Sequence, residues 1–189
     1  MSGMQICTYL WIVFLVVWIS WAFLAKPTQS QEGVSSRLSY VVLTVAGVLL
    51  MFSAQAPRAW LAIPIFPATR WMEGLAIVVT AAGIALAFWA RAYLGGNWSS
   101  AVTVKVGHEL VRTGPYRCVR HPIYSGMLLG LLGTALARRE LRGLIAVVLV
   151  YAGFKIKSKI EEHTMIRTFG AAYDDYSRTT GAILPKLRF

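Results

Sequence analysis

The sequence contains few charged residues, and acidic residues are the scarcest of them. Only 14% of its 189 residues are charged, against roughly 25% in a typical soluble domain. Hydrophobic residues make up 57% of the chain, and they occur in long blocks instead of alternating with polar residues. A soluble protein of this size exposes too much surface to hide so many apolar side chains. The composition therefore predicts a chain of about one domain that is covered by lipid.

Cysteine is also scarce, and the signatures of several enzyme classes are missing. Cys7 lies in the first apolar block and Cys118 in a basic segment, so the sequence predicts neither a disulfide nor a metal site. It contains no Walker loop, no G-x-G-x-x-G after a strand, no H-E-x-x-H and no G-x-S-x-G. Machinery for hydrolysis or nucleotidyl transfer is therefore not visible in it.

The chain is strongly basic, with 19 Lys and Arg residues, 8 Asp and Glu residues and a net charge of +11. Proteins that bind nucleic acid carry such charge in patches on a polar surface. Here the basic residues lie between apolar blocks, where membrane proteins keep the charges that set their orientation. We therefore predict no nucleic-acid partner. Contact with anionic membrane lipid is an alternative use of the same charges.

Five apolar blocks predict membrane-spanning helices, each of which needs about 20 residues. The blocks cover residues 4–24, 38–56, 74–90, 123–137 and 141–154. The last two are short and are joined by a charged run, 138–142, that is too polar for hydrocarbon. They are expected to form a tight helical hairpin whose small face contains Gly126, Gly130 and Gly133. The predicted fold is an all-α integral membrane protein of about five transmembrane helices, with a cytoplasmic connecting segment and a C-terminal helix.

The distribution of positive charge predicts the orientation of these helices. Most Lys and Arg residues fall on the side that holds residues 91–120 and the tail from Lys155 onward. Because the more positive side usually faces the cytoplasm, we expect the C-terminus inside and the N-terminus outside a prokaryotic cytoplasmic membrane. Residues 1–5 lack the basic stretch of a secretory signal, so the first block is expected to stay in the protein.

Two polar segments on the predicted cytoplasmic side contain the groups that could carry chemistry. The first, 91–122, is rich in His, Tyr and Arg, and its Gly-Pro pair at 114–115 predicts a turn. Pro122 suits the first turn of the helix that follows. The second segment begins near Lys155 and is expected to stay helical to about Gly170. The chain is thus divided into transmembrane helices (1–90) and a catalytic region (91–189), the latter made of a connecting segment (91–122), the hairpin (123–154) and a tail (155–189).

Residue types alone indicate a binding site without naming its reaction. Lys157 and Glu161 are four residues apart and share a helix face. As an exposed ion pair they would contribute under about 1 kcal/mol. Tyr173 and Tyr176 also share a face and are expected to pack against the membrane surface. Together, the two segments suit an anionic or amphipathic small molecule at the membrane face.

Four motifs in this region resemble those of the isoprenylcysteine carboxyl methyltransferase family and its phospholipid-methyltransferase-like relatives. In order along the chain they are His108-x-Leu-Val-x-x-Gly-x-Tyr116, Arg120-His-Pro-x-Tyr124-x-Gly126, Glu161-Glu162 with Phe169-Gly-x-x-Tyr173-x-x-Tyr176, and Leu184-Pro185. The resemblance covers residues 94–187. A lone Arg-His-Pro would carry little weight, whereas four motifs in order around an apolar hairpin are specific.

The resemblance implies a membrane methyltransferase that uses S-adenosylmethionine and lacks a soluble Rossmann-type domain. It implies a cofactor pocket, open to the cytoplasm, lined at these positions: His108, Glu109, Leu110, Val111, Tyr116, His121, Pro122, Ile123, Tyr124 and Glu161. Glu161 would hold the charged methionyl end of the cofactor. The rings of Tyr116 or Tyr124 could attract its sulfonium by cation–π contact.

The implied methyl acceptor is a lipophilic molecule, such as an isoprenylcysteine-type carboxylate, that enters from the bilayer. Arg120 and Lys157 are candidates to bind its carboxylate. The family has an arginine at the position of Lys157, and lysine keeps the charge but loses the planar fork that grips a carboxylate. Binding and alignment could then promote transfer without a dedicated base.

Three other functions remain open from the sequence. A phospholipid amine as acceptor would need a base, for which His121 or His163 is available. A reductase resembling sterol reductases would use NADPH, whose 2′-phosphate calls for an arginine cluster such as Arg112, Arg117 and Arg120. A non-catalytic membrane scaffold would bind neither cofactor.

Overall fold

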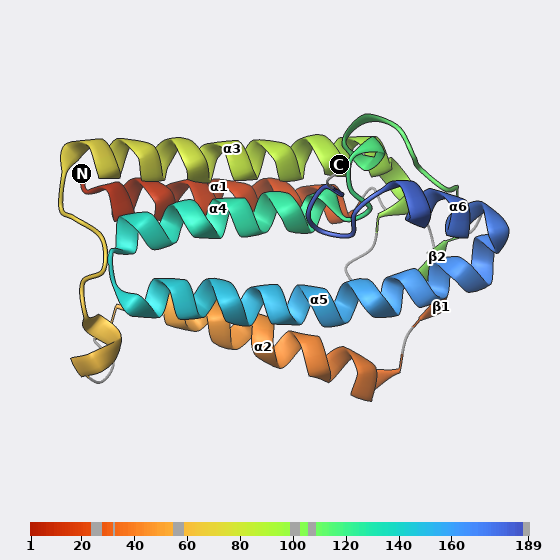
Figure 1. Cartoon of the computed structure of the whole chain (residues 1–189), viewed down its shortest axis with the longest axis horizontal. Helices are drawn as coiled ribbons and strands as arrows, with labels where there is room; N and C mark the ends of the chain where they lie inside the picture. Colours follow the sequence, from red (N-terminus) through yellow and green to blue (C-terminus); the bar gives the residue numbers. More distant parts are fainter. Residues whose placement is uncertain (24–27, 32, 55–58, 99–102, 106–108, 187–189) are drawn as a thin grey trace.

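A computed structural model of the chain describes residues 1–23, 28–31, 33–54, 59–98, 103–105 and 109–186. The elements in these residues are α1 (Gly3–Ala22), β1 (Thr28–Gln31), α2 (Val34–Phe52), α3 (Arg70–Leu94), β2 (Thr103–Lys105), α4 (Pro122–Arg138), α5 (Leu141–Phe169) and α6 (Ala171–Thr179) (Figure 1). The long helices α1 to α5 correspond to the five apolar blocks of the sequence and run side by side (Figure 1). The prediction of a helical protein is confirmed, with one small antiparallel ribbon of β1 and β2 added to it.

Local sequence explains where several of these helices begin and end. Ser2 precedes α1, and its hydroxyl accepts a hydrogen bond of 3.3 Å from the N–H of Gln5. α4 begins at Pro122, as predicted, because proline has the helical φ and lacks the N–H that a first turn leaves unpaired. α5 ends before Gly170, whose φ of 53° is unstrained only for glycine.

Two of the helices meet the requirements for crossing a membrane. α1 and α3 are long and apolar enough by length and composition, and the Ser36–Phe52 part of α2 is a shorter apolar helix. Large apolar side chains of α1, among them Val13, Val16 and Ile19, are exposed on the outside of the protein. Such a surface is suited to contact with lipid. The total of five spans stays a prediction.

Glycines bring α3 and α4 into close contact. A methyl group added to Gly83 would lie 2.2 Å from the backbone nitrogen of Gly130, and one added to Gly133 would lie 2.5 Å from the backbone nitrogen of Thr80. Only a hydrogen atom fits at these positions. The predicted small face of the hairpin therefore exists, but its partner is α3 and not α5. α5 packs its own Gly153 against α2.

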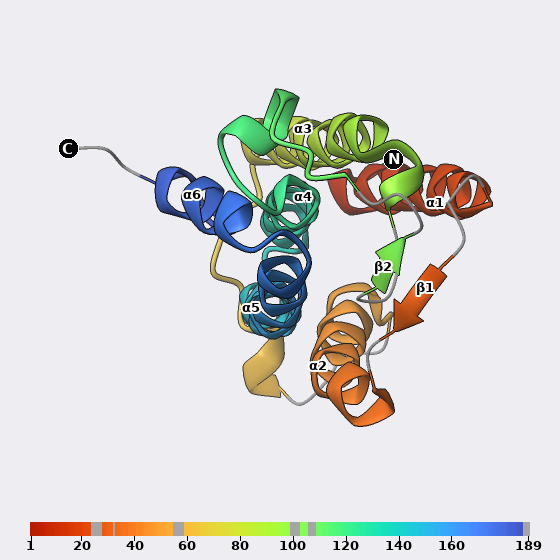
Figure 2. The same ribbon diagram turned by 90° about the vertical axis from the view of Figure 1, so that its right-hand side faces the viewer.

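The contact between α2 and α5 is equally close. A methyl group on Gly47 would lie 2.7 Å from the side chain of Val150, and one on Gly153 would lie 2.6 Å from the hydroxyl of Thr44. The long helices thus form two groups, α1 with α3 and α4, and α2 with α5 (Figure 2). The inner faces of α4 and α5 lie opposite each other between the groups.

A tight turn joins the two groups and confirms the predicted helical hairpin. Arg139 follows α4 with a φ of 62°, and α5 begins two residues later. The segment before α3 holds this turn in place. The N–H of Ile65 donates to the carbonyl of Arg139 at 2.7 Å, and the N–H of Leu141 donates to the carbonyl of Ile63 at 3.0 Å.

The opposite end of the protein, which we call the polar end, brings the two polar segments together. α5 continues past its apolar block to Phe169, and α6 turns back beside it (Figure 1). The chain after α6 then reaches the loop before α4, where Val119 and Gly181 form a parallel bridge. The predicted boundary at residues 90–91 falls inside α3, so the first part of the chain is continuous with the polar end.

Candidate functional site

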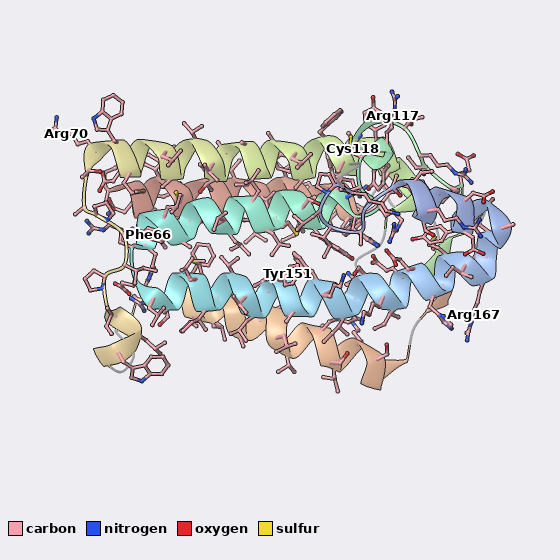
Figure 3. The ribbon with its side chains drawn as sticks, in the orientation of Figure 1. Phe66, Arg70, Arg117, Cys118, Tyr151 and Arg167 are labelled. Atoms are coloured by element: carbon pink, nitrogen blue, oxygen red, sulfur yellow. The ribbon has the colours of Figure 1, made fainter. Side chains whose placement is uncertain are left out.

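A cavity of about 490 Å³ lies between the two helix groups, within the size range of small-molecule sites. Its outer part, at the polar end, is lined by side chains from the loop before α4, from α5 and from α6. Its inner part is lined by apolar side chains of α1, α2, α4 and α5. Figure 3 shows side-chain nitrogen and oxygen atoms gathered at the polar end, where Arg117 lies. The cavity therefore joins a charged chamber, which we call the outer chamber, to an apolar chamber, which we call the inner chamber.

Most of the residues predicted for the site line this one cavity. They are Glu109, Leu110, Val111, Tyr116, Arg120, His121, Ile123, Tyr124, Lys157 and Glu161. Pro122 is fully buried in the first turn of α4. His108 lies outside the described residues. The structure thus brings together groups from two distant segments, while their individual binding roles stay predictions.

Glu161 has three polar partners at the cavity wall. The hydroxyl of Tyr124 donates to its Oε1 at 2.6 Å, the Nδ1 of His121 is 3.2 Å from Oε2, and the Nζ of Lys157 is 3.9 Å from Oε1. Burial acts to raise the pKa of Glu161, but the hydrogen bond from His121 and the charge of Lys157 outweigh it and lower the pKa. The side chain is 21% exposed. An ionised carboxylate therefore faces the cavity.

His121 lies between two carboxylates. Its Nδ1 faces Glu161, and its Nε2 is 3.2 Å from Oε1 of Glu162. A neutral imidazole can donate from only one ring nitrogen, so two acceptors favour the imidazolium. Burial acts to lower the pKa of His121, but the two carboxylates raise it more strongly, and the net shift is upward. The ring is also stacked on Tyr124, with centroids 5.4 Å apart.

Glu162, whose role was not predicted, connects α5 to the loop before α4. Arg120 approaches its Oε1 with Nε at 2.9 Å and Nη2 at 2.8 Å. The Nη1 of Arg120 donates to the carbonyls of Ser177 and Thr180. Because arginine has five N–H groups, most of its donors are committed to the protein itself. Lys157 is therefore the better of the two candidates for binding an acceptor.

Tyrosines of α6 complete the outer part of the cavity. Tyr173 and Tyr176 line it and are only 3% and 6% exposed. The hydroxyl of Tyr176 donates to the carbonyl of Tyr116 at 2.6 Å. The prediction that this pair packs against the membrane surface is wrong, because α6 folds back over the loop. The N–H of His121 donates to the carbonyl of Ala182 at 3.0 Å, which holds the returning chain in place.

Lys157 occupies the junction between the charged and apolar parts of the cavity. It lies one helical turn before Glu161 on α5, toward the apolar block. Its Nζ is 5.3 Å from the ring centroid of Tyr40 and 5.6 Å from that of Tyr124, within the range of cation–π contact. The side chain is 12% exposed. A cation is thus held at the point where the charged part of the cavity meets the apolar part.

An aromatic wall around Arg91 closes another side of the cavity, and it was not predicted from the sequence. Arg91, in the last turn of α3, is 3% exposed, and its Cζ is 4.2 Å from the ring centroid of Trp98. Its Nη1 and Nη2 donate to the carbonyls of Gly95 at 2.7 Å and Trp21 at 2.9 Å. The rings of Trp98 and Trp18 meet edge to face at 5.5 Å, and both line the cavity.

The inner part of the cavity is apolar and reaches the protein surface. Its lining residues include Trp11, Phe14, Leu15, Thr44, Val48, Phe52, Leu131, Val150 and Phe154. Leu15 of α1 and Val48 of α2 are 52% and 39% exposed while also lining the cavity. An opening toward the surroundings therefore lies between these two helices, on the apolar flank of the protein.

The chemistry of the lining suits an organic ligand better than a metal ion. In the described part of the chain, no group of three or more His, Cys, Asp and Glu side chains could hold a metal. The outer chamber instead combines the Glu161 carboxylate with the rings of Tyr116, Tyr124 and Tyr173. A carboxylate beside aromatic faces is a favourable environment for an organic cation.

Comparison with known proteins gives the family. Residues 71–172 match the phospholipid methyltransferase family. The chain belongs to this family. The matched region starts near the beginning of α3 and ends just inside α6, so it contains most of the cavity wall apart from α1 and α2. The resemblance that the four motifs indicate is confirmed.

Similar proteins include both methyltransferases and proteins of metal resistance. The nickel-cobalt-cadmium resistance protein NccN of Alcaligenes xylosoxydans xylosoxydans is 29% identical over 62% of this chain and 53% of its own length. Protein-S-isoprenylcysteine O-methyltransferase B of Arabidopsis thaliana is 26% identical over 65% of this chain and 66% of its own length. The protein-S-isoprenylcysteine O-methyltransferase of Saccharomyces cerevisiae is 33% identical over 48% of this chain and 39% of its own length.

The chain spans roughly half the length of the curated relatives it matches. The aligned part is 53% of NccN, 38% of the Bacillus subtilis protein YpbQ and 43% of the mouse protein-S-isoprenylcysteine O-methyltransferase. Their names describe functions of those longer proteins.

Proposed function

We propose that the protein is a membrane-embedded methyltransferase that uses S-adenosylmethionine to methylate a lipophilic carboxylate at the cytoplasmic face. One observation carries the proposal. All but two of the residues to which the family resemblance gives a cofactor role line a single cavity, and that cavity continues into an apolar chamber. Family membership supports the same reaction class.

The outer chamber fits S-adenosylmethionine by the chemistry of its walls. When bound, the cofactor supplies an electrophilic methyl group on a positively charged sulfur. Glu161 is ionised and faces the cavity, so it can accept hydrogen bonds from the ammonium of the methionyl end. The rings of Tyr116 and Tyr124 can attract the sulfonium. The imidazolium of His121, which lines the same cavity, holds Glu161 in place through its Nδ1.

The inner chamber fits an amphipathic acceptor. Its apolar tail would pass between α1 and α2 at the opening beside Leu15 and Val48. The cation of Lys157 would bind the carboxylate head at the junction of the chambers. Methyl transfer needs the attacking oxygen aligned with the methyl and sulfur, and alignment can contribute about 7–11 kcal/mol to lowering a barrier. The surrounding aromatic side chains would exclude water from this point.

Contacts within the site favour a carboxylate acceptor over the other possibilities. A carboxylate needs no base, whereas an amine must lose a proton, and both ring nitrogens of His121 are already engaged with carboxylates. Two of the three arginines considered for the 2′-phosphate of NADPH are also engaged with the protein itself. Arg112 donates to the carbonyl of Ala172 at 2.5 Å, and Arg120 is bound to Glu162. The membrane orientation that belongs to this proposal has five spans and a cytoplasmic polar end.

Binding of S-adenosylmethionine to the purified protein tests the proposed cofactor. Titration calorimetry in detergent should give saturable binding, with no binding of NADPH run in parallel. Glu161→Gln should raise the Kd for S-adenosylmethionine about 10- to 100-fold, because one charged hydrogen-bond partner contributes about 1.5–3 kcal/mol.

Asp175→Asn is the matched control for that variant. Asp175 is also an acid of the polar end but is 73% exposed on α6, so its Kd should equal that of the wild type. Unchanged affinity in Glu161→Gln, or binding of NADPH in place of S-adenosylmethionine, would contradict the proposal.

A further inference from the structure

The inner end of the apolar chamber is closed by one residue from each of four helices. Going away from the polar end, the last lining residue is Trp11 on α1, Phe52 on α2, Leu131 on α4 and Val150 on α5. Beyond these positions none of the four helices contributes a described residue to the lining. These four side chains, which we call the floor, therefore set the depth of the cavity.

Trp11 is the largest side chain of the floor, and it is fixed in position. Its indole N–H donates to the hydroxyl of Thr134 at 2.9 Å. Its ring meets Phe14 and Phe52 edge to face, at centroid distances of 5.3 Å and 6.4 Å. Its far edge lies against Gly130, where an added methyl group would be 3.0 Å from the indole. A hydrogen bond and three packing contacts thus hold the ring across the cavity.

The distance from the polar junction to the floor defines the acceptor chain that fits. Leu131 is seven residues beyond Tyr124 on α4, which is about 10 Å along a helix. Val150 is eleven residues before Glu161 on α5, which is about 16 Å. An extended chain advances roughly 3.5 Å for every three bonds. The chamber therefore holds about 9–14 bonds of an extended tail.

We propose that Trp11, held by Thr134, determines the maximum length of the apolar tail that the acceptor site takes. This inference rests on the proposed function, because it assigns the inner chamber to the acceptor. Tails that end at the floor gain affinity with each added methylene, about fourfold per group buried. Longer tails must bend within the chamber or leave part of the chain outside, so each further methylene lowers the affinity.

The test is the preference between two tail lengths in the absence of cofactor. An equimolar mixture of N-acetyl-S-dodecylcysteine and N-acetyl-S-hexadecylcysteine is added to the detergent-purified protein, and the bound ratio is read by native mass spectrometry. The partitioning of each probe into detergent is the same whichever variant is present. The bound ratios can therefore be compared between variants. The wild type should bind the dodecyl probe in preference.

Two variants should move this ratio in opposite directions. Trp11→Leu removes the ring from the floor and should raise the ratio of hexadecyl to dodecyl probe at least about fivefold, since more than one further methylene is then buried. Leu131→Phe places a larger side chain in the floor and makes the chamber shorter. It should lower the ratio of hexadecyl to dodecyl probe and favour an octyl probe. A general loss of stability would weaken both probes and leave the ratio unchanged, so the ratio reports on shape.

Trp89→Leu is the matched control, because it is the same substitution outside the cavity lining. Trp89 is 51% exposed on α3 and meets Tyr93 edge to face. Its ratio should equal that of the wild type. An unchanged ratio in both Trp11→Leu and Leu131→Phe would overturn the inference. So would a wild type that binds no probe, which would also contradict the proposed acceptor. If the ratio shifts in the variants but the protein does not bind S-adenosylmethionine, the role of Trp11 is supported and the proposed cofactor is overturned.

Discussion

At the scale of single residues, Lys157 and Glu161 give the two parts of the cavity opposite charges. Both lie on the same face of α5, one turn apart, and their side chains meet at 3.9 Å. Glu161 lies toward the charged chamber and Lys157 toward the apolar one. In the proposed reaction the carboxylate binds a cationic cofactor and the ammonium binds an anionic acceptor, so one turn of helix can position both reactants.

Lys157→Ala should therefore affect the acceptor more than the cofactor. Loss of one charged partner of a carboxylate costs about 1.5–3 kcal/mol, so the KM for a thioether carboxylate acceptor should rise about 10- to 100-fold. The Kd for S-adenosylmethionine should stay within roughly threefold of the wild type, since Glu161 keeps His121 and Tyr124 as partners.

Lys155→Ala is the control for this variant, because Lys155 is exposed on the same helix. Lys157→Arg should retain acceptor use, since the guanidinium keeps the charge and adds a planar pair of donors. Collapse of cofactor binding in Lys157→Ala would show that Lys157 serves the outer chamber instead.

At the scale of helices, the cavity exists because the helices within each of the two groups pack against one another without gaps. α3 and α4 approach through Gly83, Gly126 and Gly133, and α2 and α5 through Gly47 and Gly153. Since the two helices of each pair leave no space between each other, the cavity lies between one pair and the other. Side chains larger than hydrogen at the contacts would push the helices apart and change the cavity.

Gly83→Ala should accordingly destabilise the protein. Its new methyl group would overlap the backbone of α4, and such overpacking typically costs about 1–3 kcal/mol. The measurement is the midpoint of thermal unfolding in detergent, followed by circular dichroism. Gly74→Ala, in the same helix with no atom within 4 Å of the added methyl group, should be neutral or slightly stabilising. Equal midpoints for the two variants would contradict the packing described for α3 and α4.

Sequence patterns predicted the helices and their ends well, for local reasons. Proline at the start of α4 and glycine after α5 act within one helical turn, so they can be recognised without knowledge of the fold. The motifs also predicted which residues line the outer chamber, because those residues lie in two short segments. They did not predict Glu162, whose side chain gains its role only when Arg120 and His121 reach it from another segment.

The inner chamber could not be predicted from the sequence. α1 is apolar on all sides, so its periodicity does not indicate which face lies inward, and Trp11 and Trp18 look like lipid-facing side chains. The inward position of Tyr173 and Tyr176 depends on the turn at Gly170 and on contacts between Arg120 and the carbonyls after α6. Contacts of this kind join residues far apart in the chain and leave no local signal.

At the scale of the whole molecule, one cavity is enclosed by the two helix groups, the hairpin turn and the returning C-terminal segment. Between the helix groups (Figures 1 and 2), a chamber lined by charged and aromatic side chains joins a chamber open toward apolar surroundings. An enzyme that transfers a group between a water-soluble donor and a lipid needs both kinds of chamber in contact. The junction at Lys157, Tyr124 and Glu161 is where the two reactants would meet.

Transfer of a labelled methyl group tests this account most directly. The purified protein is incubated with S-adenosylmethionine carrying a tritiated methyl group and with N-acetyl-S-dodecylcysteine, and the organic extract is counted before and after treatment with alkali. The account predicts label in the extract that alkali releases as volatile methanol, since a methyl ester hydrolyses, and loss of this label in Glu161→Gln. An extract without label, or with label that withstands alkali, would contradict it.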